Sequence, residues 1–394
     1  MEYGGLTYVS PLSILVALAA SIALPATLNL WLWHRDRRRA ERLAAGERPI
    51  APFAKHEPAP RVSFLVAAWN EADMIDRCIE AVEQLTYPDL ELVLCAGGSD
   101  GTFALAARHL DARVKVIEQQ PGEGKQHALQ RCLEASTGSI VYLIDADCII
   151  IDETFRQCMA PILREGEAVV TGSFYWPLPE QLENPFVVSQ TVSRAYTAAV
   201  QPKYGPGLLG GNCVMRREAL IQAGAFSNSV RTGTDYDLAK RLLANGQRIR
   251  HIARAWIHSE LPTTYGAYFR QQARWIRNVV VHGVSYHDYG LVISSASTSI
   301  VGLVMLFVLP FALWLTFMHG YLELSGQCLT LLWLLAFFHA LFARVRYQLF
   351  TAQWFGVSEM KRVPWQLPVF LLLDFTAWSL PLLEYPFQSL RVRW

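Results

Sequence analysis

The chain has almost no net charge, and few of its polar residues are spaced like metal ligands or catalytic nucleophiles. Its 394 residues include 35 Lys and Arg against 34 Asp and Glu, for a formal charge of +1. Without a general positive field, the chain is not predicted to bind nucleic acid. The ten histidines and seven cysteines lack zinc-ligand spacing, and the odd, scattered cysteines favour reduced, buried thiols. No Ser/His/Asp or Cys/His nucleophile pattern is present either.

Apolar residues are abundant instead, at 52% of the chain, and they concentrate near its two ends. Residues 9–33 carry no charge, and this length suffices to cross a bilayer, which takes about 20 residues. A basic cluster follows, made up of Arg35, Arg37, Arg38, Arg39 and Arg42. Basic flanks stay in the cytoplasm, so we predict a transmembrane helix over residues 1–34 and a cytoplasmic linker over 35–60. A signal peptide is not favoured, because the charges follow the apolar segment.

The second apolar region, residues 291–394, contains three stretches, 292–318, 328–343 and 367–383. The first is long enough to span and the other two are marginal, so the chain is predicted to cross the membrane three or four times. Asp374 lies within the last stretch, where a carboxylate in lipid is costly. We therefore expect that stretch to pack inside the bundle, near the route of an acceptor.

The N-terminus is predicted to lie outside the cell. Four crossings would place the C-terminus outside as well. Arg391 and Arg393 lie at that end, which favours the smaller count. Basic residues also cluster at Arg344, Arg346, Lys361 and Arg362.

Between the apolar ends, strand-like and helix-like patterns alternate. Short β-rich runs occupy residues 62–67, 90–95, 114–117 and 140–144, and helical periodicity occupies 73–85, 102–110 and 125–136. Such alternation predicts an α/β fold with a mainly parallel sheet covered by helices, over residues 61–262. Ligands of such sheets bind at the carboxyl ends of the strands.

Polar residues follow three of these strands. They are Asn70 and Glu71, Asp100, and the pair Asp145 and Asp147. Paired carboxylates are ligands for Mg²⁺ or Mn²⁺ held jointly with a diphosphate. Alone, an Asp-x-Asp is more often a loop with two solvated acids, but convergence on one edge of the sheet favours a binding site.

Asp235 lies where a helix over residues 235–244 is predicted to begin. It could simply cap that helix. It could also act as a general base, because a helix N-terminus keeps a carboxylate ionised and able to take a proton from an attacking hydroxyl. Asp237 is the rival candidate for this role.

Two further segments carry candidate ligand contacts. Lys125 opens a helix after a Gly-Glu-Gly turn and could pair with a phosphate or a carboxylate near a nucleotide. Gly211 and Asn212 belong to a Gly-Gly-Asn-Cys segment, which allows close backbone approach. That segment is either part of an acceptor pocket or only a tight turn.

Gln271, Arg274 and Trp275 lie on one face of a helix predicted within residues 263–290, at the membrane interface. Gln and Arg could hold a diphosphate, and Trp could stack on a sugar. The alternative is an interfacial helix whose Trp and Arg only anchor it among lipid headgroups.

The order of these motifs resembles the membrane-embedded family 2 glycosyltransferases, which include cellulose, chitin and hyaluronan synthases and ceramide glucosyltransferase. The matching segments, within residues 61–280, are Asn70-Glu71, Gly124-Lys125, Asp145-Ala-Asp147, Asp235 and Gln271-x-x-Arg274-Trp275. The resemblance implies a GT-A fold with Rossmann-like topology and an inverting mechanism. It also implies that Asp100 contacts the nucleotide base and that Asp145 and Asp147 hold the diphosphate and its metal. Asp235 would be the base, with Gln271 and Arg274 on the pyrophosphate and Trp275 under the acceptor sugar.

Two positions depart from the family pattern. Cys95-Ala-Gly-Gly replaces the usual Asp-Asp-Gly-Ser, and Thr234 replaces the acid that usually precedes the base. The Cys95 segment and the Asp235-Tyr-Asp-Leu-Ala-Lys run resemble the ceramide glucosyltransferase branch, whereas the Asp-x-Asp and the Gln271 segment resemble polysaccharide synthases.

The resulting hypothesis is an integral membrane glycosyltransferase with a cytoplasmic catalytic domain. It would use a nucleotide sugar, UDP-linked, and a membrane-associated carbohydrate or lipid acceptor, with membrane lipid around it. A growing cell-surface polysaccharide is the favoured acceptor and a glycolipid headgroup the alternative. An inactive scaffold or partner subunit of a polysaccharide export complex is the rival of another class.

Overall fold

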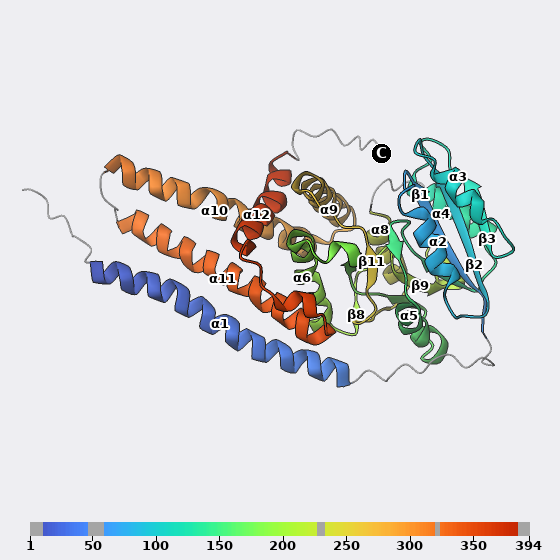
Figure 1. Cartoon of the computed structure of the whole chain (residues 1–394), viewed down its shortest axis with the longest axis horizontal. Helices are drawn as coiled ribbons and strands as arrows, with labels where there is room; N and C mark the ends of the chain where they lie inside the picture. The colour runs from blue at the N-terminus through green and yellow to red at the C-terminus, as the bar shows by residue number, and fades with distance from the viewer. Residues whose placement is uncertain (1–10, 46–58, 227–232, 320–323, 385–394) are drawn as a thin grey trace, which may run out of the picture. The chain divides into compact units, whose positions relative to one another are not determined.

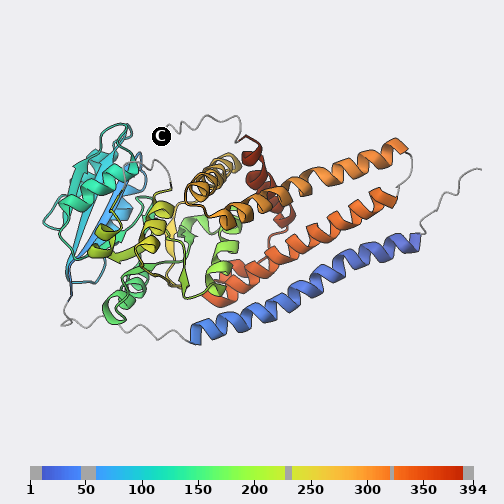
Figure 2. The ribbon, with the colours of Figure 1, turned by 180° about the vertical axis from the view of Figure 1, so that it is seen from behind.

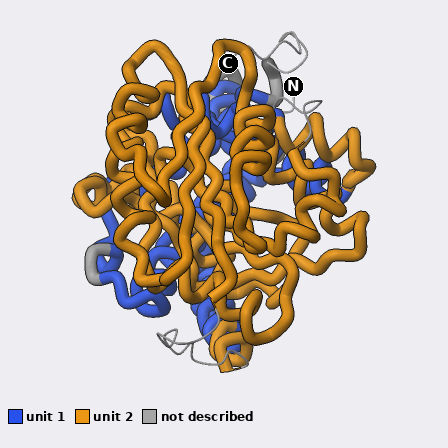
Figure 3. The backbone as a smooth tube through the Cα atoms, turned by 90° about the vertical axis from the view of Figure 1, so that its right-hand side faces the viewer, with its two compact units in different colours: residues 1–39, 265–277, 290–386 blue, residues 40–264, 278–289, 387–394 orange. Residues whose placement is uncertain are grey.

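The computed structural model describes residues 11–45, 59–226, 233–319 and 324–384. The chain forms two compact units (Figure 3). Among the described residues, the sheet unit comprises 40–45, 59–226, 233–264 and 278–289, and the helical unit comprises 11–39, 265–277, 290–319 and 324–384.

The sheet unit is built on an eight-stranded sheet (Figure 1). In spatial order its strands are β3 (Val114–Glu118), β2 (Leu90–Gly97), β1 (Val62–Trp69), β4 (Ile140–Leu143), β9 (Cys213–Arg216), β6 (Val169–Thr171), β10 (Ile249–His251) and β8 (Tyr204–Gly205). The pairs from β3 to β4 are parallel, as predicted, so the α/β fold with a mainly parallel sheet is confirmed. The sequence patterns missed β9, which runs antiparallel between β4 and β6.

A smaller sheet adjoins this one, with the order β5 (Cys148–Ile149), β11 (Ile257–Ser259) and β7 (Tyr175–Pro177). Its strands are only two or three residues long, too short for a period-two pattern to be visible in the sequence. β5 begins directly after Asp147, so the smaller sheet holds the chain at the C-terminal end of the Asp-x-Asp segment.

Helices cover both faces of the large sheet. Alternation along β1 sends Phe64 and Val66 to one core and Leu65 to the other. The first core is covered by α2 (Ile75–Glu83), α3 (Thr102–Ala106) and α5 (Asp152–Arg164), and the second by α4 (Gly124–Ala135), α7 (Arg217–Gln222) and α8 (Thr234–Ala244). This unit also contains α6 (Pro185–Val200). The predicted helices over 73–85, 102–110, 125–136 and 235–244 are therefore present, the second ending in a short 3-10 turn, Ala107–His109.

The helical unit contains α1 (Pro11–Ala45, up to Arg39), α10 (Tyr289–His319, from Gly290), α11 (Leu324–Phe355), α12 (Leu367–Glu384) and the first part of α9 (Tyr265–Ser285). Three helical segments in the described part of the chain are long and apolar enough to cross a membrane, namely Leu12–Ala45, Tyr289–Ala312 and Gly326–Phe355. The apolar part of α12, Leu367–Pro381, is shorter. The three long apolar segments suggest association with a membrane.

α1 and α11 lie side by side and run in the same direction (Figures 1 and 2). Asn29 of α1 contacts His339 of α11, and seven residues further on Asp36 contacts Arg346. Both basic clusters, after residue 34 and after residue 343, therefore lie toward the same end of the helical unit.

Three expectations need comment. α1 continues to Ala45, so its helix extends into the segment predicted as a linker from residue 35, because Arg and Ala are good helix formers. Residues 46–58 of that linker, together with Arg391 and Arg393, lie outside the described residues. Six of the seven free cysteines are buried as predicted, but Cys328 is exposed on α11, since it lies on an apolar membrane-length helix.

Candidate active site

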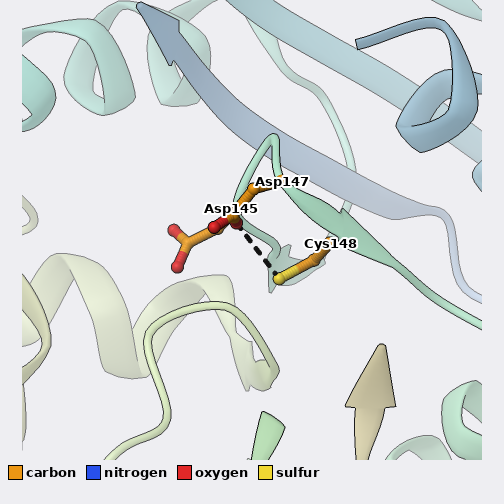
Figure 4. A group of neighbouring side chains, drawn as sticks. All are labelled: Asp145, Asp147 and Cys148. Carbon is orange, nitrogen blue, oxygen red and sulfur yellow. Dashed lines mark hydrogen bonds between the residues drawn. The ribbon is translucent and has the colours of Figure 1, made fainter. Parts of the chain in front are cut away.

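Asp145 and Asp147 lie in the short connection between β4 and β5, at the carboxyl end of a strand buried on both faces (Figure 4). Ligand atoms of Asp145, Asp147 and Cys148 all lie within 4.8 Å of one another. The Cys148 thiol lies 3.4 Å from Asp147 Oδ1, and Ser259 Oγ lies 3.4 Å from Asp147 Oδ2. The paired carboxylates predicted from the sequence are thus brought together.

Asp145 is held from two sides. Lys125, at the start of α4, donates to Oδ1, so its observed partner is a carboxylate. The Tyr175 hydroxyl on β7 lies 3.2 Å from Oδ2 and accepts a hydrogen bond of 3.0 Å from the Gly211 amide. An added Cβ at Gly211 would lie 2.9 Å from Asp145 Oδ2, so only glycine lets the backbone come this close.

Asp235 lies at the first turn of α8, and its side chain lies close to the Gly210–Gly211 backbone, which also approaches Asp145. A Cβ added at Gly210 would lie 3.2 Å from Asp235 Cβ, whereas at the next residue, Gly211, it would meet Asp145. The Asp235 carboxylate is half-buried and accepts a hydrogen bond of 2.9 Å from the Tyr236 amide. It therefore combines an anchored position with exposure to solvent.

Asp237, the rival base, is occupied by protein partners. It is buried, with 2% exposure. Arg241 forms a salt bridge of 2.8 Å with its Oδ2, and the Tyr286 hydroxyl donates to its Oδ1. A carboxylate bound by a guanidinium and a phenol inside the protein is a poor proton acceptor for a substrate. The geometry therefore favours Asp235.

The site holds more negative than positive charge. Burial, and then repulsion by Asp145, raises the pKa of Asp147 to about 6. Burial, and then repulsion by Asp147 and Asp145, raises the pKa of Glu71 to about 7. Burial also raises the pKa of Asp235, an effect that Lys125 partly opposes. Burial alone would lower the pKa of Lys125, but the attraction of Asp145, Asp235 and Asp147 raises it.

A divalent cation fits this arrangement. Two carboxylates repel each other and offer hard oxygen ligands, and a cation between them would remove the repulsion that raises the pKa of Asp147. Cys148 is an unsuitable ligand for Mg²⁺ or Mn²⁺, because these hard cations prefer oxygen ligands to the soft sulfur of a thiol. The two aspartates, and not the thiol, are the residues that would hold the metal.

The loops after β1 and β2 interlock at the same edge of the sheet. The Asn70 side chain accepts from the Ser99 amide at 2.8 Å, and Asn70 has a positive φ of 58°. Asp100 accepts from the Ala72 amide at 3.0 Å and from the Thr102 hydroxyl at 2.7 Å. Asp100 is exposed, so its remaining lone pairs still face solvent.

Asn212 requires a correction. It is fully buried, its amide nitrogen donates to the Ala255 carbonyl at 2.9 Å, and its oxygen accepts from the Tyr142 hydroxyl at 2.6 Å. These bonds use the side chain inside the core, so it is not available to an acceptor. The tight-turn interpretation holds for Asn212, whereas Gly211 does reach the acid cluster.

Two aromatic residues near the carboxyl ends of these strands were missed in the sequence. Tyr175 bridges Asp145 and Gly211 but follows no motif, because it comes from a strand of three residues. Trp69 ends β1, and its ring lies 2.9 Å from a Cβ added at Gly97, which is opposite it in the register. An aromatic ring at the carboxyl end of a strand, directly before Asn70, was the signal that could have identified it.

Gln271, Arg274 and Trp275 lie on α9, as predicted, in the part of that helix that belongs to the helical unit. Gln271 and Trp275 are half-buried and Arg274 is exposed. The acid cluster and Lys125 belong to the sheet unit, so the contribution of these three residues to the same site remains a prediction.

Comparison with known proteins identifies the family to which the chain belongs. Glycosyltransferase AglE of Haloferax volcanii is 24% identical over 193 residues, which cover 46% of this chain and 61% of the relative. The poly-beta-1,6-N-acetyl-D-glucosamine synthase of Staphylococcus epidermidis is 21% identical over 258 residues, 63% of this chain and 61% of the relative. The chain thus spans about three fifths of the length of these relatives.

Among solved structures, a mannosyltransferase of Pyrobaculum calidifontis in complex with GDP-Man and Mn²⁺ is similar to 83% of this chain and 98% of its own. The identity is 19% and the TM-score 0.48. The family model described as "Glycosyltransferase like family 2" matches residues 59–278, more than half of the chain. This match covers the GT-A-like α/β fold and all the strand-end carboxylates described above, and the protein belongs to the family 2 glycosyltransferases.

Proposed function

We propose that the protein is an inverting, metal-dependent glycosyltransferase that moves a sugar from a nucleotide sugar, UDP-linked, to an acceptor in the membrane. One observation carries the proposal. Asp145, Asp147 and the half-buried Asp235 lie around a single lysine, Lys125, in a protein of the glycosyltransferase family. This surplus of carboxylates suits a cation with a diphosphate, and it leaves one carboxylate to accept a proton.

In this proposal an acceptor hydroxyl oxygen attacks the anomeric carbon, and the bond from that carbon to the diphosphate oxygen breaks. Asp235 accepts the hydroxyl proton, and its raised pKa makes it a stronger base than an ordinary aspartate. Asp145 and Asp147 would hold the Mg²⁺ or Mn²⁺, which when bound offsets the charge that develops on the leaving diphosphate. Lys125, half-exposed and already paired with Asp145, supplies a positive charge to the same group.

The remaining predicted contacts divide between the nucleotide and the acceptor. Asn70, Glu71 and Asp100 would hold the nucleotide at the carboxyl edge of β1 and β2, with the Trp69 ring beside the base. On α9, Gln271 and Arg274 would bind the pyrophosphate and Trp275 would lie under the acceptor sugar. Gly211 would provide close backbone approach on the acceptor side.

The acceptor we favour is a growing cell-surface polysaccharide, which the poly-beta-1,6-N-acetyl-D-glucosamine synthases among the relatives support. A glycolipid headgroup is the second candidate. It is supported by the segment beginning at Cys95 and the run beginning at Asp235, which resemble ceramide glucosyltransferase.

We further propose that the sheet unit is cytoplasmic. The parallel course of α1 and α11 gives both of their basic clusters the same side, as the positive-inside rule requires. With the three candidate spans found among the described residues, an N-terminus outside the cell would place residues 34–290, and the chain after α11, inside. Labelling of a cysteine introduced at Ser358, in sealed vesicles of known orientation, tests this placement. Labelling from outside the cell would contradict it.

The experiment that tests the activity incubates the purified protein with a panel of UDP- and GDP-sugars and lipids from the native membrane. We expect transfer from at least one donor, loss of transfer in EDTA, and recovery with Mn²⁺ or Mg²⁺. Product analysis separates a polysaccharide from a glycolipid. Full activity in EDTA contradicts the metal assignment, and the absence of turnover with every donor favours the scaffold alternative.

A further inference from the structure

The α9 segment that carries Gln271, Arg274 and Trp275 is bound to α12 by two tyrosine hydroxyls. Tyr268 donates to Asp374 Oδ1 at 2.6 Å, and Tyr265 shares a hydrogen bond with the Thr376 hydroxyl. Tyr268 is 3% exposed and Asp374 4% exposed. The contact is therefore a buried polar connection between two helices of the helical unit.

Asp374 is at the same time paired with Arg344 of α11, which donates to the other carboxylate oxygen, Oδ2. The Arg344 guanidinium, 7% exposed, also lies 5.5 Å from the centre of the Trp378 ring. α9, α11 and α12 thus meet at one aspartate. Both oxygens of the Asp374 carboxylate accept hydrogen bonds, so the carboxylate is held in place. It therefore fixes the direction of the Tyr268 hydroxyl that donates to it.

A second buried ion pair in the same unit provides a comparison. Asp36 of α1 binds Arg346 of α11 at 3.1 Å, with 2% and 7% exposure. Arg344 and Arg346 are two residues apart and so lie on nearly opposite sides of α11, at ~100° per residue. One pair joins α11 to α1. The other joins α11 to α12 and, through the Tyr268 hydroxyl, to α9. Of these two similar ion pairs, the Asp374 pair therefore contacts the helix that carries the Gln-x-x-Arg-Trp segment, and the Asp36 pair joins α11 to α1.

Tyr268, Gln271 and Trp275 are spaced i, i+3 and i+7 along α9, so they lie on one side of the helix. A rotation or axial shift at Tyr268 would displace the other two side chains with it. Groups that hold reacting atoms lose about 10²-fold in rate for a displacement of ~1 Å. The Tyr268 hydroxyl is therefore in a position to control where Gln271 and Trp275 point.

We propose that Tyr268, Asp374 and Arg344 are positioning residues that set the rotation and depth of the Gln271–Trp275 segment for donor and acceptor binding. The inference rests on the proposed function, since it takes Gln271, Arg274 and Trp275 as the groups that bind diphosphate and sugar. It assigns Asp374 a position in the acceptor machinery rather than in lipid, and it explains why a carboxylate lies in a short apolar helix.

The test compares Tyr268→Phe with Asp36→Asn in the full-length protein. Tyr268→Phe removes only a hydroxyl, and Asp36→Asn weakens the other buried pair without touching α9. Three quantities are measured for each variant: the thermal unfolding midpoint, hydrogen exchange of the peptide covering residues 269–277, and the ratio of sugar transfer to nucleotide-sugar hydrolysis. Asp374→Asn is the second variant, because its amide oxygen can still accept from Tyr268.

Both substitutions are expected to lower the unfolding midpoint. Only Tyr268→Phe should speed exchange in residues 269–277 and reduce transfer per folded molecule, by about 10- to 100-fold, with hydrolysis reduced less. Asp374→Asn should show the same pattern more weakly, and Asp36→Asn should leave transfer within about twofold. The inference is overturned if Tyr268→Phe leaves transfer unchanged, or if Asp36→Asn changes exchange and transfer to the same extent. Failure of the proposed function gives a different result, because the wild-type protein itself would then show no transfer.

Discussion

The buried ion pairs of the helical unit and the half-buried acid cluster of the sheet unit compensate their carboxylates in opposite ways. In the described helical unit the buried acids, Asp36 and Asp374, are each matched by one arginine of α11. In the described part of the sheet unit, Asp145, Asp147 and Asp235 are half-buried and lie around Lys125. The buried pairs thus neutralise their acids internally, and the acid cluster is left with a negative surplus.

This difference distinguishes charges that are neutralised within the fold from charges that remain for interaction with a ligand. A buried ion pair is satisfied within the fold, and removing one partner leaves an uncompensated charge. In the acid cluster, burial and then repulsion between neighbouring carboxylates raise the pKa of Asp147 and of Glu71, so the ionised cluster destabilises the folded protein. The same test distinguishes Asp235 from Asp237 two residues away, because among the described residues Asp237 is paired with Arg241 and Asp235 forms no ion pair with an arginine.

The largest effect is expected at Asp235. Asp235→Asn should reduce transfer by ~10²–10⁴-fold, the range for loss of a general base, with nucleotide-sugar binding retained. Asp237→Asn is the matched control and should instead lower stability by about 1–3 kcal/mol, because it weakens the bonds to Arg241 and Tyr286. Transfer kinetics and calorimetric binding on both variants check this. If Asp237→Asn is the crippling change, the distinction by pairing is wrong.

A smaller effect, about 10- to 100-fold, is expected from Gly211→Ala. Its methyl group would lie 2.9 Å from both Asp145 Oδ2 and the Tyr175 hydroxyl and would push the acid cluster apart. Gly207→Ala serves as the control, since nothing lies within 4 Å of an added Cβ there. Steady-state transfer rates decide the matter. Equal rates for the two variants would mean that the close approach at Gly211 does not matter for the chemistry.

Asp147→Asn should change stability in opposite directions with and without metal. The folded-state pKa of Asp147, about 6, lies above its ordinary value of 3.8. The folded state therefore binds the Asp147 proton more tightly than the unfolded state does. The stability that this proton contributes is fully present below about pH 4 and is lost as the pH rises through about 6. In EDTA at pH 8 the Asn variant should be more stable than wild type, by up to about 3 kcal/mol.

In saturating Mn²⁺ the order should reverse, because only wild type keeps the full metal site and gains stability from binding. Thermal unfolding of both proteins with EDTA and with Mn²⁺ measures this without any activity assay. Wild-type stability that does not respond to Mn²⁺ at pH 8 would remove the support for a cation at Asp145 and Asp147.

The smallest effect is expected in the helical unit. Trp333→Phe removes the hydrogen bond of 2.8 Å from the Trp333 indole to the Met305 carbonyl, between α11 and α10, at a cost of about 1 kcal/mol in stability. Transfer per folded molecule should stay unchanged, because Phe keeps an aromatic ring in the apolar cluster with Leu371 and Phe375 of α12, and the lost bond does not involve the contact between Tyr268 and Asp374. The unfolding midpoint and the transfer rate, measured on one preparation, check the predicted loss of stability and the unchanged transfer. A selective loss of transfer would show that contacts between α10 and α11 also affect the reaction.

Features that depend on local pattern could be predicted from the amino-acid sequence. The β1–β4 strands, the helices between them, the Asp145 and Asp147 pair at a strand end and the apolar helices follow from periodicity and hydropathy, which act over neighbouring residues. The order of motifs around Asp235 and Gln271 was also sufficient to indicate the family.

The partners of those residues, in contrast, depend on how distant segments pack in three dimensions. Tyr286 binds Asp237 from 49 residues away, Tyr268 binds Asp374 from 106 residues away, and Asn212 is bonded into the core by Tyr142, 70 residues before it. A carboxylate or an amide looks the same in a sequence whether it is paired or unpaired. Burial and hydrogen bonding decide which of the two it is, and both depend on packing between segments that no local pattern connects.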